Sequence, residues 1–384
     1  MKGIGIALLL LFAVHISAAP TGKVTAPAKP VYTTIDVPGA GTAAFQGTAA
    51  MSVNSLGVLA GGYIASGNVT HGFVRAADGT ITKFDAPHAG TSNNQGTFPV
   101  SISSKGVIAG MYFDAGNVYH GFVRAVDGTI TEFDVPGAGP GGHRGTHPMS
   151  INGGGTIAGS YNTGTAQTST HWHGFVRTAK GKITVFDAPG AGTGDKQGTQ
   201  APIVINNVGT VAGTYTDNNF VYHGFVRTSA GTITTFDAPG AGSAPGQRNN
   251  LQFQGTIPLG ISPKGVIVGV YSDASFVNHG FVRSATGTIT SFDVAGAGGS
   301  GTFGTVPFSV NGGGLIAGVY QDAGGVLHGF TRSATGTITP FDVPGAGTAG
   351  LLQGSVPVNI VGTKIVGAYL DSKNVLHGFL RTPK

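Results

Sequence analysis

The chain of 384 residues contains no cysteine, one tryptophan and one glutamate, and only 10% of its residues are charged. Without cysteine, neither a disulfide nor a lipid-modified cysteine is possible, so packing and hydrogen bonds must stabilise the fold. The low charge disfavours a self-repelling, disordered chain. The net charge is +5 with no run of basic residues, which disfavours nucleic acid as a partner and allows only weak attraction to anionic surfaces.

Long apolar runs are also scarce, and the one at residues 4–14 is too short to span a bilayer. Lys2 precedes this run and small residues follow it at 17–19, which is the pattern of a secretory signal peptide over residues 1–19. Residues 20–30 then indicate a short linker. We therefore expect export to the extracellular space or the periplasm, with no membrane span in the mature chain.

Glycine is abundant instead, at 68 residues, and much of it belongs to a repeated phrase. The triplet His-Gly-Phe recurs at steps of 49 to 56 residues, beginning at His71, His120, His173, His223, His279, His328 and His377. An aspartate closes each phrase: Asp36, Asp85, Asp134, Asp187, Asp237, Asp293 and Asp342. Self-similarity at this period indicates a repeat architecture.

Each repeat holds four short apolar segments separated by glycine-rich turns, as at residues 98–103, 106–112, 118–124 and 129–135. β-branched and aromatic residues dominate these segments, and no helical period is present. Asp127-Gly128 is a hairpin-turn signal between the third and fourth segments. Four-stranded units repeated seven times predict an all-β fold, a seven-bladed β-propeller of four-stranded blades over residues 31–384.

The two ends of the repeated region supply complementary parts of one blade. Residues 31–37 are predicted to form a lone fourth strand, and residues 375–381 a third strand with no fourth strand after it. Pairing of these segments would complete the seventh blade and leave no unpaired edge. We therefore expect a ring closed by the N-terminal strand rather than a linear solenoid, which would more commonly carry distinct capping repeats.

The pattern SIN-x-GxIxGxY, followed by His-Gly-Phe, GTIT and FD, resembles the bacterial extracellular repeats named after their His-Ala-Phe (HAF) motif. The resemblance covers roughly residues 31–384, although Gly121 and its equivalents stand where that motif has alanine. It implies export and a repeated β fold, and it supplies no agreed activity and no catalytic residues. GTITEFDVP at 128–136 also resembles the fourth strand of streptogramin-lyase-type propellers, a likeness of one strand per repeat.

Every repeat carries a histidine, an arginine and an aspartate, as in His120, Arg124 and Asp134. We expect these sets to be structural, with the histidine bonded to an aspartate and the arginine, at the other end of the strand, bonded to turn carbonyls. Seven near-copies fit the demands of a repeated fold, whereas an active site needs one constellation. Calcium at the aspartate rim is an alternative, although no EF-hand-like run of oxygen ligands is present.

Departures from the repeat gather in two kinds of connection, which we expect on one face and which commonly mark a binding face. Residues 243–254 lengthen one connection, and residues 162–172 lengthen another and include the only tryptophan. The predicted ligand-binding residues are Trp172, His171, His143, Arg144, His147, Arg248, Asn249 and Phe253. The aromatic side chains would stack on a sugar or peptide, and the polar ones would supply directional hydrogen bonds.

Two other interpretations of these residues remain open. His143, His147 and His171 could bind a zinc ion, although glycine-flanked loops would hold it loosely. Alternatively, Trp172 covers only the edge of its own blade. No resident cofactor is otherwise expected.

Three functions fit the sequence. The leading one is a secreted binding module that recognises a glycan or a cell-envelope partner, as a monomer or with weak self-association. The second is an extracellular structural or matrix protein that self-associates. The third is a propeller lyase or hydrolase, which is disfavoured because no G-x-S-x-G, HExxH or spaced carboxylate pair occurs and Glu132 is the only glutamate. We predict no catalytic residue.

Overall fold

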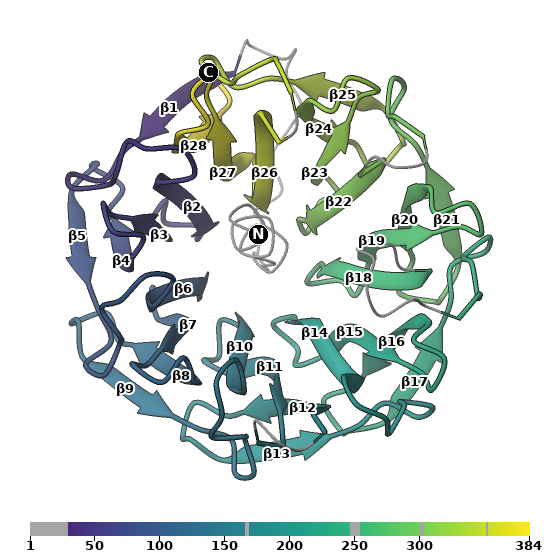
Figure 1. Cartoon of the computed structure of the whole chain (residues 1–384). Coiled ribbons are helices and arrows are strands. Elements are labelled where there is room, and N and C mark those ends of the chain that lie inside the picture. Colours follow the sequence, from purple (N-terminus) through teal and green to yellow (C-terminus); the bar gives the residue numbers. More distant parts are fainter. Residues whose placement is uncertain (1–29, 166–168, 246–253, 300–302, 351) are drawn as a thin grey trace.

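The computed structural model describes residues 30–165, 169–245, 254–299, 303–350 and 352–384. The described residues form 28 β-strands and no helix, joined in one propeller-like sheet that runs around a ring (Figure 1). Residues 1–29, which hold the predicted signal peptide and nearly all of the predicted linker, lie outside the described residues. The all-β prediction is confirmed.

Successive strands form antiparallel units of four, and we name each unit by its first strand. The first strands lie nearest the centre of the ring (Figure 1): β2 (Gly47–Val53), β6 (Gly96–Ile102), β10 (Gly145–Ile151), β14 (Gln197–Ile205), β18 (Gly255–Ile261), β22 (Thr305–Val310) and β26 (Gly354–Val361). The second strands are β3 (Leu59–Ile64), β7 (Ile108–Phe113), β11 (Ile157–Asn162), β15 (Val211–Thr216), β19 (Ile267–Ser272), β23 (Ile316–Gln321) and β27 (Lys364–Leu370).

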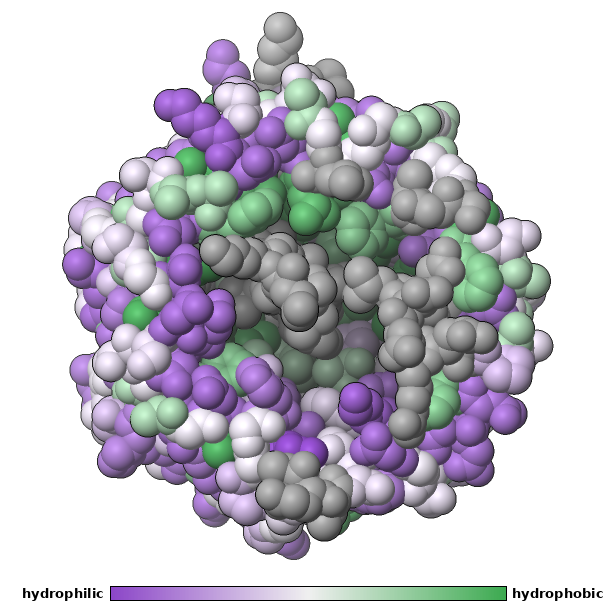
Figure 2. Space-filling view, viewed as in Figure 1, coloured by the Kyte–Doolittle hydropathy of each residue, from purple (hydrophilic) through white to green (hydrophobic). Residues whose placement is uncertain are grey.

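The third strands begin at or just before the repeated histidine: β4 (Thr70–Arg75), β8 (Tyr119–Arg124), β12 (His171–Arg177), β16 (Tyr222–Arg227), β20 (Asn278–Arg283), β24 (Leu327–Arg332) and β28 (Leu376–Thr382). The outer, fourth strands are β5 (Ile81–Phe84), β9 (Ile130–Phe133), β13 (Ile183–Phe186), β17 (Ile233–Phe236), β21 (Ile289–Phe292), β25 (Ile338–Phe341) and, for the β26 unit, β1 (Val31–Ile35). Figure 2 shows one face of this ring, hollowed at its centre, with hydrophobic residues visible on the wall of the hollow.

The hydrophobic cores lie between neighbouring units. The phenylalanine of every His-Gly-Phe triplet is 0% exposed. In the joint between the β10 and β14 units, Phe225 packs with Ala158 of the preceding unit. Burial of seven such rings is the main source of stability that the sequence offers in place of disulfides.

Two further contacts recur at the joints. The backbone N–H after each closing aspartate donates to a hydroxyl of the next first strand at 2.8–3.0 Å, as from Val135 to Thr146. The arginine guanidinium lies over a phenylalanine ring of the preceding unit, as Arg124 lies over Phe84 at 4.9 Å. Its Nη1 also donates to the carbonyl of Ala125 in its own turn, as the sequence predicts.

Glycine in the His-Gly-Phe triplet is required by a close cross-strand contact. Gly224 pairs with Phe236, and a Cβ at Gly224 would lie 2.7 Å from Phe236 Cζ. The equivalent glycines face the same ring in their own units: Gly72, Gly121, Gly174, Gly280 and Gly329. The exception is Gly378, which faces Ile35 and whose Cβ would have its nearest neighbour at 3.1 Å. This contact explains why six of the seven triplets require glycine at their middle position.

The ring is closed by the two ends of the repeated region, as the sequence predicts. β1 pairs with β28 in antiparallel register from Val31 opposite Thr382 to Ile35 opposite Gly378 (Figure 1). Ile35 is buried in the core between the β26 and β2 units. At the same joint, the Val53 N–H donates to Asn359 Oδ1 at 3.1 Å.

We expect Gly224→Ala to lower the free energy of unfolding by about 1–3 kcal/mol, because the new methyl group displaces the Phe236 ring from the joint. Gly378→Ala is the matched control and should cost clearly less, since no aromatic ring faces that position. Chemical denaturation of both variants checks this. Equal losses would contradict the glycine–phenylalanine explanation.

Deletion of residues 20–40 removes β1 and Ile35 with it. β28 then becomes an unpaired edge, so we expect aggregation or a fall in Tm of several degrees or more. Calorimetry and light scattering measure the two outcomes. A deletion variant that is monomeric and melts with the parent would refute closure of the ring by β1.

Candidate functional site

Five of the eight predicted ligand-binding residues lie together at one end of the β10 unit. His143 and Arg144 precede β10, His147 lies in β10, and His171 and Trp172 begin β12. Arg248, Asn249 and Phe253 lie outside the described residues.

The sequence-based placement of Trp172 in a loop was wrong. Trp172 is in β12 and pairs with Asn162 of β11, so it occupies the place of Tyr119 and Tyr222 in neighbouring units. The insertion ends before β12 because the register that pairs Tyr161 with His173 extends back to Trp172.

Aromatic rings form a row across the joint between the β6 and β10 units. The His147 ring lies 4.0 Å from the Tyr119 ring and 5.1 Å from the Trp172 ring, measured between centroids. Phe113 extends the row, at 3.9 Å from Tyr119. Trp172 is half-buried. Its contact with His147 of its own unit agrees with the interpretation that it covers the edge of that unit.

His147 is an unusual residue for its position. It is 6% exposed, and its Nε2 has no hydrogen-bond partner. Burial lowers the pKa of His147 to about 3, so the imidazole is neutral at physiological pH. Five of the other six units place apolar side chains at the equivalent position, Ala49, Phe98, Ile257, Val306 and Val356, and the β14 unit has Gln200, whose Nε2 donates to Thr216 Oγ1. A buried polar atom without a partner costs about 1–3 kcal/mol, so this histidine lowers stability where an apolar residue would not.

The connections around His147 are held by polar contacts. Arg144 Nε donates to Thr170 Oγ1 at 3.1 Å, and the Thr170 N–H donates to Asp195 Oδ1 at 2.8 Å. The His143 N–H donates to the Asn117 carbonyl at 2.7 Å. Connections from fourth to first strands therefore meet connections from second to third strands on one face, as the sequence predicts. We call it the loop face.

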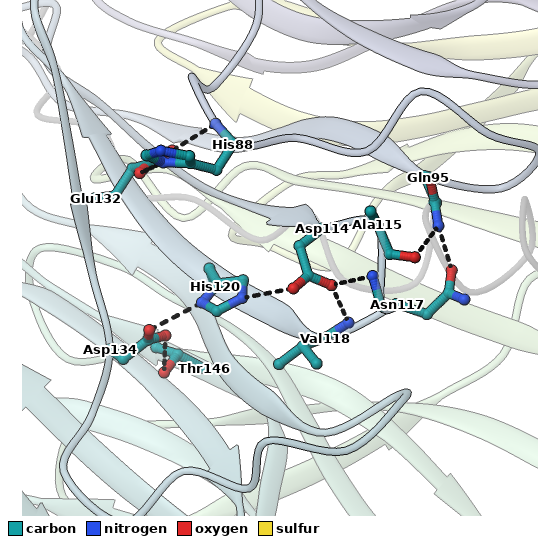
Figure 3. Close-up of polar contacts among 11 residues, drawn as sticks. His88, Gln95, Asp114, Ala115, Asn117, Val118, His120, Glu132, Asp134 and Thr146 are labelled. Atoms are coloured by element: carbon teal, nitrogen blue, oxygen red, sulfur yellow. Dashed lines mark hydrogen bonds and ion pairs between the residues drawn. The ribbon is translucent and has the colours of Figure 1, made fainter.

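The repeated histidines and aspartates also lie on the loop face, towards its outer rim. In every repeat the histidine Nδ1 lies 2.8–3.0 Å from the closing aspartate. Its ring stacks on a tyrosine of the second strand, as His120 stacks on Tyr112 at 4.9 Å. In five repeats the histidine Nε2 faces a second aspartate, as Asp114 faces His120 in Figure 3.

The expected histidine–aspartate bond is thus confirmed, and it lies at the partly exposed rim of the ring. The histidine side chains are 20–29% exposed and the closing aspartates 48–57%. The hydrogen bond that His120 donates to Asp134 raises the pKa of His120, and the one that His223 donates to Asp237 raises the pKa of His223. These pairs stabilise the rim by less than a buried pair would.

One titratable contact was missed by the sequence analysis. The Glu132 carboxylate lies 2.6 Å from His88 Nδ1 and accepts the His88 backbone N–H at 3.2 Å (Figure 3). Both residues depart from the repeat. His88 stands where the next repeat has Gly137, which has a positive φ, and Glu132 is the only glutamate of the chain. The sequence signal for this contact was that adjacent repeats each have one unusual residue, His88 in one and Glu132 in the next. Burial, with Glu132 and nearby aspartates, raises the pKa of Tyr112 well above its usual range, the opposite of what an activated nucleophile requires.

Among the described residues no group of three or more His, Cys, Asp or Glu side chains is placed to hold a metal ion. His143, His147 and His171 are all described and do not form such a group. The part of the chain that the structure describes also has no helix with the length and hydropathy needed to cross a membrane.

No family model and no curated protein matches the sequence. Among solved structures, a puromycin hydrolase is 13% identical over 93% of this chain and 54% of its own, with a TM-score of 0.47. The lectin BP39L from Burkholderia pseudomallei is 10% identical over 85% of this chain and 94% of its own, with a TM-score of 0.45. AofleA from Arthrobotrys oligospora is 13% identical over 88% and 98%, with a TM-score of 0.32. The chain spans about half the length of the hydrolase, and likenesses at this level assign no activity.

We expect His223→Ala to lower the free energy of unfolding by roughly 1 kcal/mol or less, because its partner Asp237 is half exposed. The pair contributes fully below the unfolded histidine pKa of about 6.5 and is lost as pH rises through the raised folded pKa. The loss should therefore be larger near pH ~5.5 than near pH ~8.5.

Thr199→Ala is the control for this comparison. Thr199 Oγ1 accepts the Ala188 N–H at 2.8 Å and does not titrate in this range, so its loss should not depend on pH. Denaturation of both variants at the two pH values measures the difference. A pH-independent loss for His223→Ala would contradict the pairing of a protonated histidine with Asp237.

Proposed function

We propose that this chain is an exported, seven-bladed β-propeller of the HAF-repeat type that acts as a binding module for a glycan or a cell-envelope component. Its site is the end of the β10 unit on the loop face, around Trp172, His147 and Arg144. The four-stranded units and the closure of the ring by β1 support the propeller architecture. The signal-like residues 1–19 support export.

The observation that carries this proposal is the buried His147. Its Nε2 has no protein partner, whereas five of the six equivalent positions hold apolar side chains and the sixth, Gln200, is hydrogen-bonded to Thr216. A chain selected for stability alone would fill this place as it does with Val306 and Val356. A residue kept at a cost in stability beside the only tryptophan indicates a functional site.

The chemistry of the site suits a ligand with both an apolar face and hydroxyl or amide groups. Trp172 and Tyr119 offer ring surface, and the sole indole stands at the edge of the loop face. The Arg144 side chain is fixed by Thr170 and by the Gly142 carbonyl, so its guanidinium is already oriented. Preorganised polar groups beside aromatic surface are typical of sugar-binding and peptide-binding sites.

Binding fits these residues better than catalysis does. The His147 imidazole is held neutral and buried, with a pKa of about 3, too low for a general base near neutral pH. The elevated pKa of Tyr112 likewise removes it as a nucleophile. Glu132, the one glutamate, is engaged by His88.

A glycan array followed by titration of tryptophan fluorescence tests the proposal. Trp172→Ala should weaken binding of the array's strongest ligand by about 30-fold or more, the loss of an aromatic anchor worth about 2 kcal/mol. Because Trp172 lies in β12 and packs on His147, this variant should also lose some stability, contrary to what a loop position would imply. Calorimetry measures the ligand affinity of variants that lack the indole.

Two variants separate binding from folding. Trp172→Tyr introduces the residue of the equivalent positions Tyr119 and Tyr222, so it should keep the parent Tm and still bind more weakly. His147→Val should keep or raise the Tm and weaken binding, while Lys264→Ala on the opposite face changes neither. Full affinity in both Trp172→Tyr and His147→Val would refute the site.

A further inference from the structure

Charge is divided between the two faces of the ring. Each third strand starts with a histidine on the loop face and ends with an arginine on the opposite face, which we call the turn face. The turn face consists of the turns from first to second and from third to fourth strands. Its described basic residues are Arg75, Arg124, Arg177, Arg227, Arg283, Arg332, Arg381, Lys105, Lys180, Lys182, Lys264 and Lys364. The acidic residues in those turns are Asp78 and Asp127.

The loop face carries the opposite charge. All seven closing aspartates lie there, with five more beside the second strands. The described residues carry 17 Lys and Arg against 16 Asp and Glu, so a basic face and an acidic face nearly cancel in the total charge. A count of charges along the sequence does not show this division, which is why only weak attraction to anionic surfaces was expected.

None of the turn-face arginines in the described part of the chain forms an ion pair, although Arg75 interacts at longer range with Asp78 and Arg124 with Asp127. Among the described residues, the ion pairs all join histidines to carboxylates. Arg177 illustrates the arrangement: its guanidinium lies 4.6 Å from the centre of the Phe133 ring and donates to the Thr178 carbonyl. In the other five repeats the guanidinium is thus held in place with no described turn carboxylate beside it.

Apolar side chains project from the same face. Leu56, Val126 and Val208 are 65%, 68% and 66% exposed, the highest values among large hydrophobic residues of the described chain. Each stands at the tip of a turn, and Lys105 and Lys264 stand at the corresponding tips of other units. A boundary of anionic headgroups over acyl chains would cover both kinds of side chain, since it removes apolar tips from water beside basic ones.

A cavity opens on the turn face between the β6 and β10 units. Its volume is about 220 Å³, and its lining includes Ser103, Lys105, Gly154 and Arg177. Two cations beside a serine hydroxyl suit the phosphate of a lipid headgroup, a small anion with several acceptor oxygens.

We propose that the turn face docks on an anionic phospholipid surface, with the basic ring attracting the headgroups and Leu56, Val126 and Val208 entering the interface. The chain then lies on the membrane without crossing it. Anionic lipid is favoured over a soluble polyanion because a hydrophilic polymer would leave the three apolar tips in water. The proposal is independent of the ligand site, because it uses the opposite face and leaves Trp172 pointing away from the lipid.

Vesicle co-sedimentation of the mature chain tests this inference. The protein should bind phosphatidylcholine vesicles that contain about one third phosphatidylglycerol, and it should bind pure phosphatidylcholine at least about 10-fold more weakly. Raising the salt from roughly 0.05 to 0.5 M should weaken the binding to the anionic vesicles by a similar factor. Equal binding to both kinds of vesicle would overturn the electrostatic part of the proposal.

Charge reversal on each face provides the matched control. Lys105→Glu combined with Lys264→Glu should lose at least about 10-fold in vesicle affinity. Lys196→Glu combined with Lys373→Glu makes the same change at exposed lysines of the loop face and should lose little. Melting curves confirm that all four substitutions leave the fold intact. Equal losses from the two pairs would show that the attraction does not depend on the turn face.

The apolar tips separate a membrane from a soluble polyanion. Leu56→Ser combined with Val208→Ser should weaken binding to anionic vesicles and leave binding to dextran sulfate unchanged. If these substitutions leave vesicle binding unchanged while the parent binds dextran sulfate as tightly as vesicles, the partner is a polyanion and the lipid proposal is wrong. None of these substitutions touches Trp172 or His147, so a failure here leaves the proposed ligand site standing.

Discussion

Contact between each unit and the unit before it is the constraint on which the whole ring depends. A single four-stranded unit cannot bury its phenylalanine, its aliphatic residues and its arginine stem alone. The repeated residues meet this need: Phe225 enters the joint, Arg227 lies over Phe186, and Thr199 receives the N–H of Ala188. Gly224 serves the same packing, because the Phe236 ring lies where a side chain at residue 224 would be. The seven-fold pattern is therefore explained by packing, and functional differences have to be sought where the pattern fails.

The sequence was sufficient for features that repeat. Apolar segments separated by glycine-rich turns predicted the strands. The lone segments at residues 31–37 and 375–381 predicted the closure of the ring. The repeat pattern did not predict how deeply a side chain is buried, or which residues far apart in the sequence contact each other. The half-exposure of the histidine–aspartate pairs follows from their place at the rim. Glu132 and His88 are 44 residues apart, and Trp172 belongs to β12 because the pairing of β11 with β12 extends back to it. The number of inserted residues does not show where the next strand begins.

The two faces differ in kind as well as in charge. The loop face varies in the length of its connections and holds the polar, aromatic end of the β10 unit. The turn face is uniform, with short turns and one arginine per repeat. Variation on one face and uniformity on the other are what selection would produce if the first met a specific ligand and the second met an extended surface. His147 fits this division, because this departure from the repeat lies at the loop-face end of the β10 unit.

The pairing of β1 with β28 also sets the order in which the ring can be completed. Asp36 and His377, which bond across this joint, are 341 residues apart in sequence. Such a contact closes the longest loop in the molecule, and its entropic cost falls after the intervening units have formed. β1, which precedes the other described strands in the sequence, is therefore the last of them to find its partner. Until it does, the β28 edge of one molecule is open to the N-terminal strand of another, and a high concentration of nascent chains favours exchange of this strand between molecules.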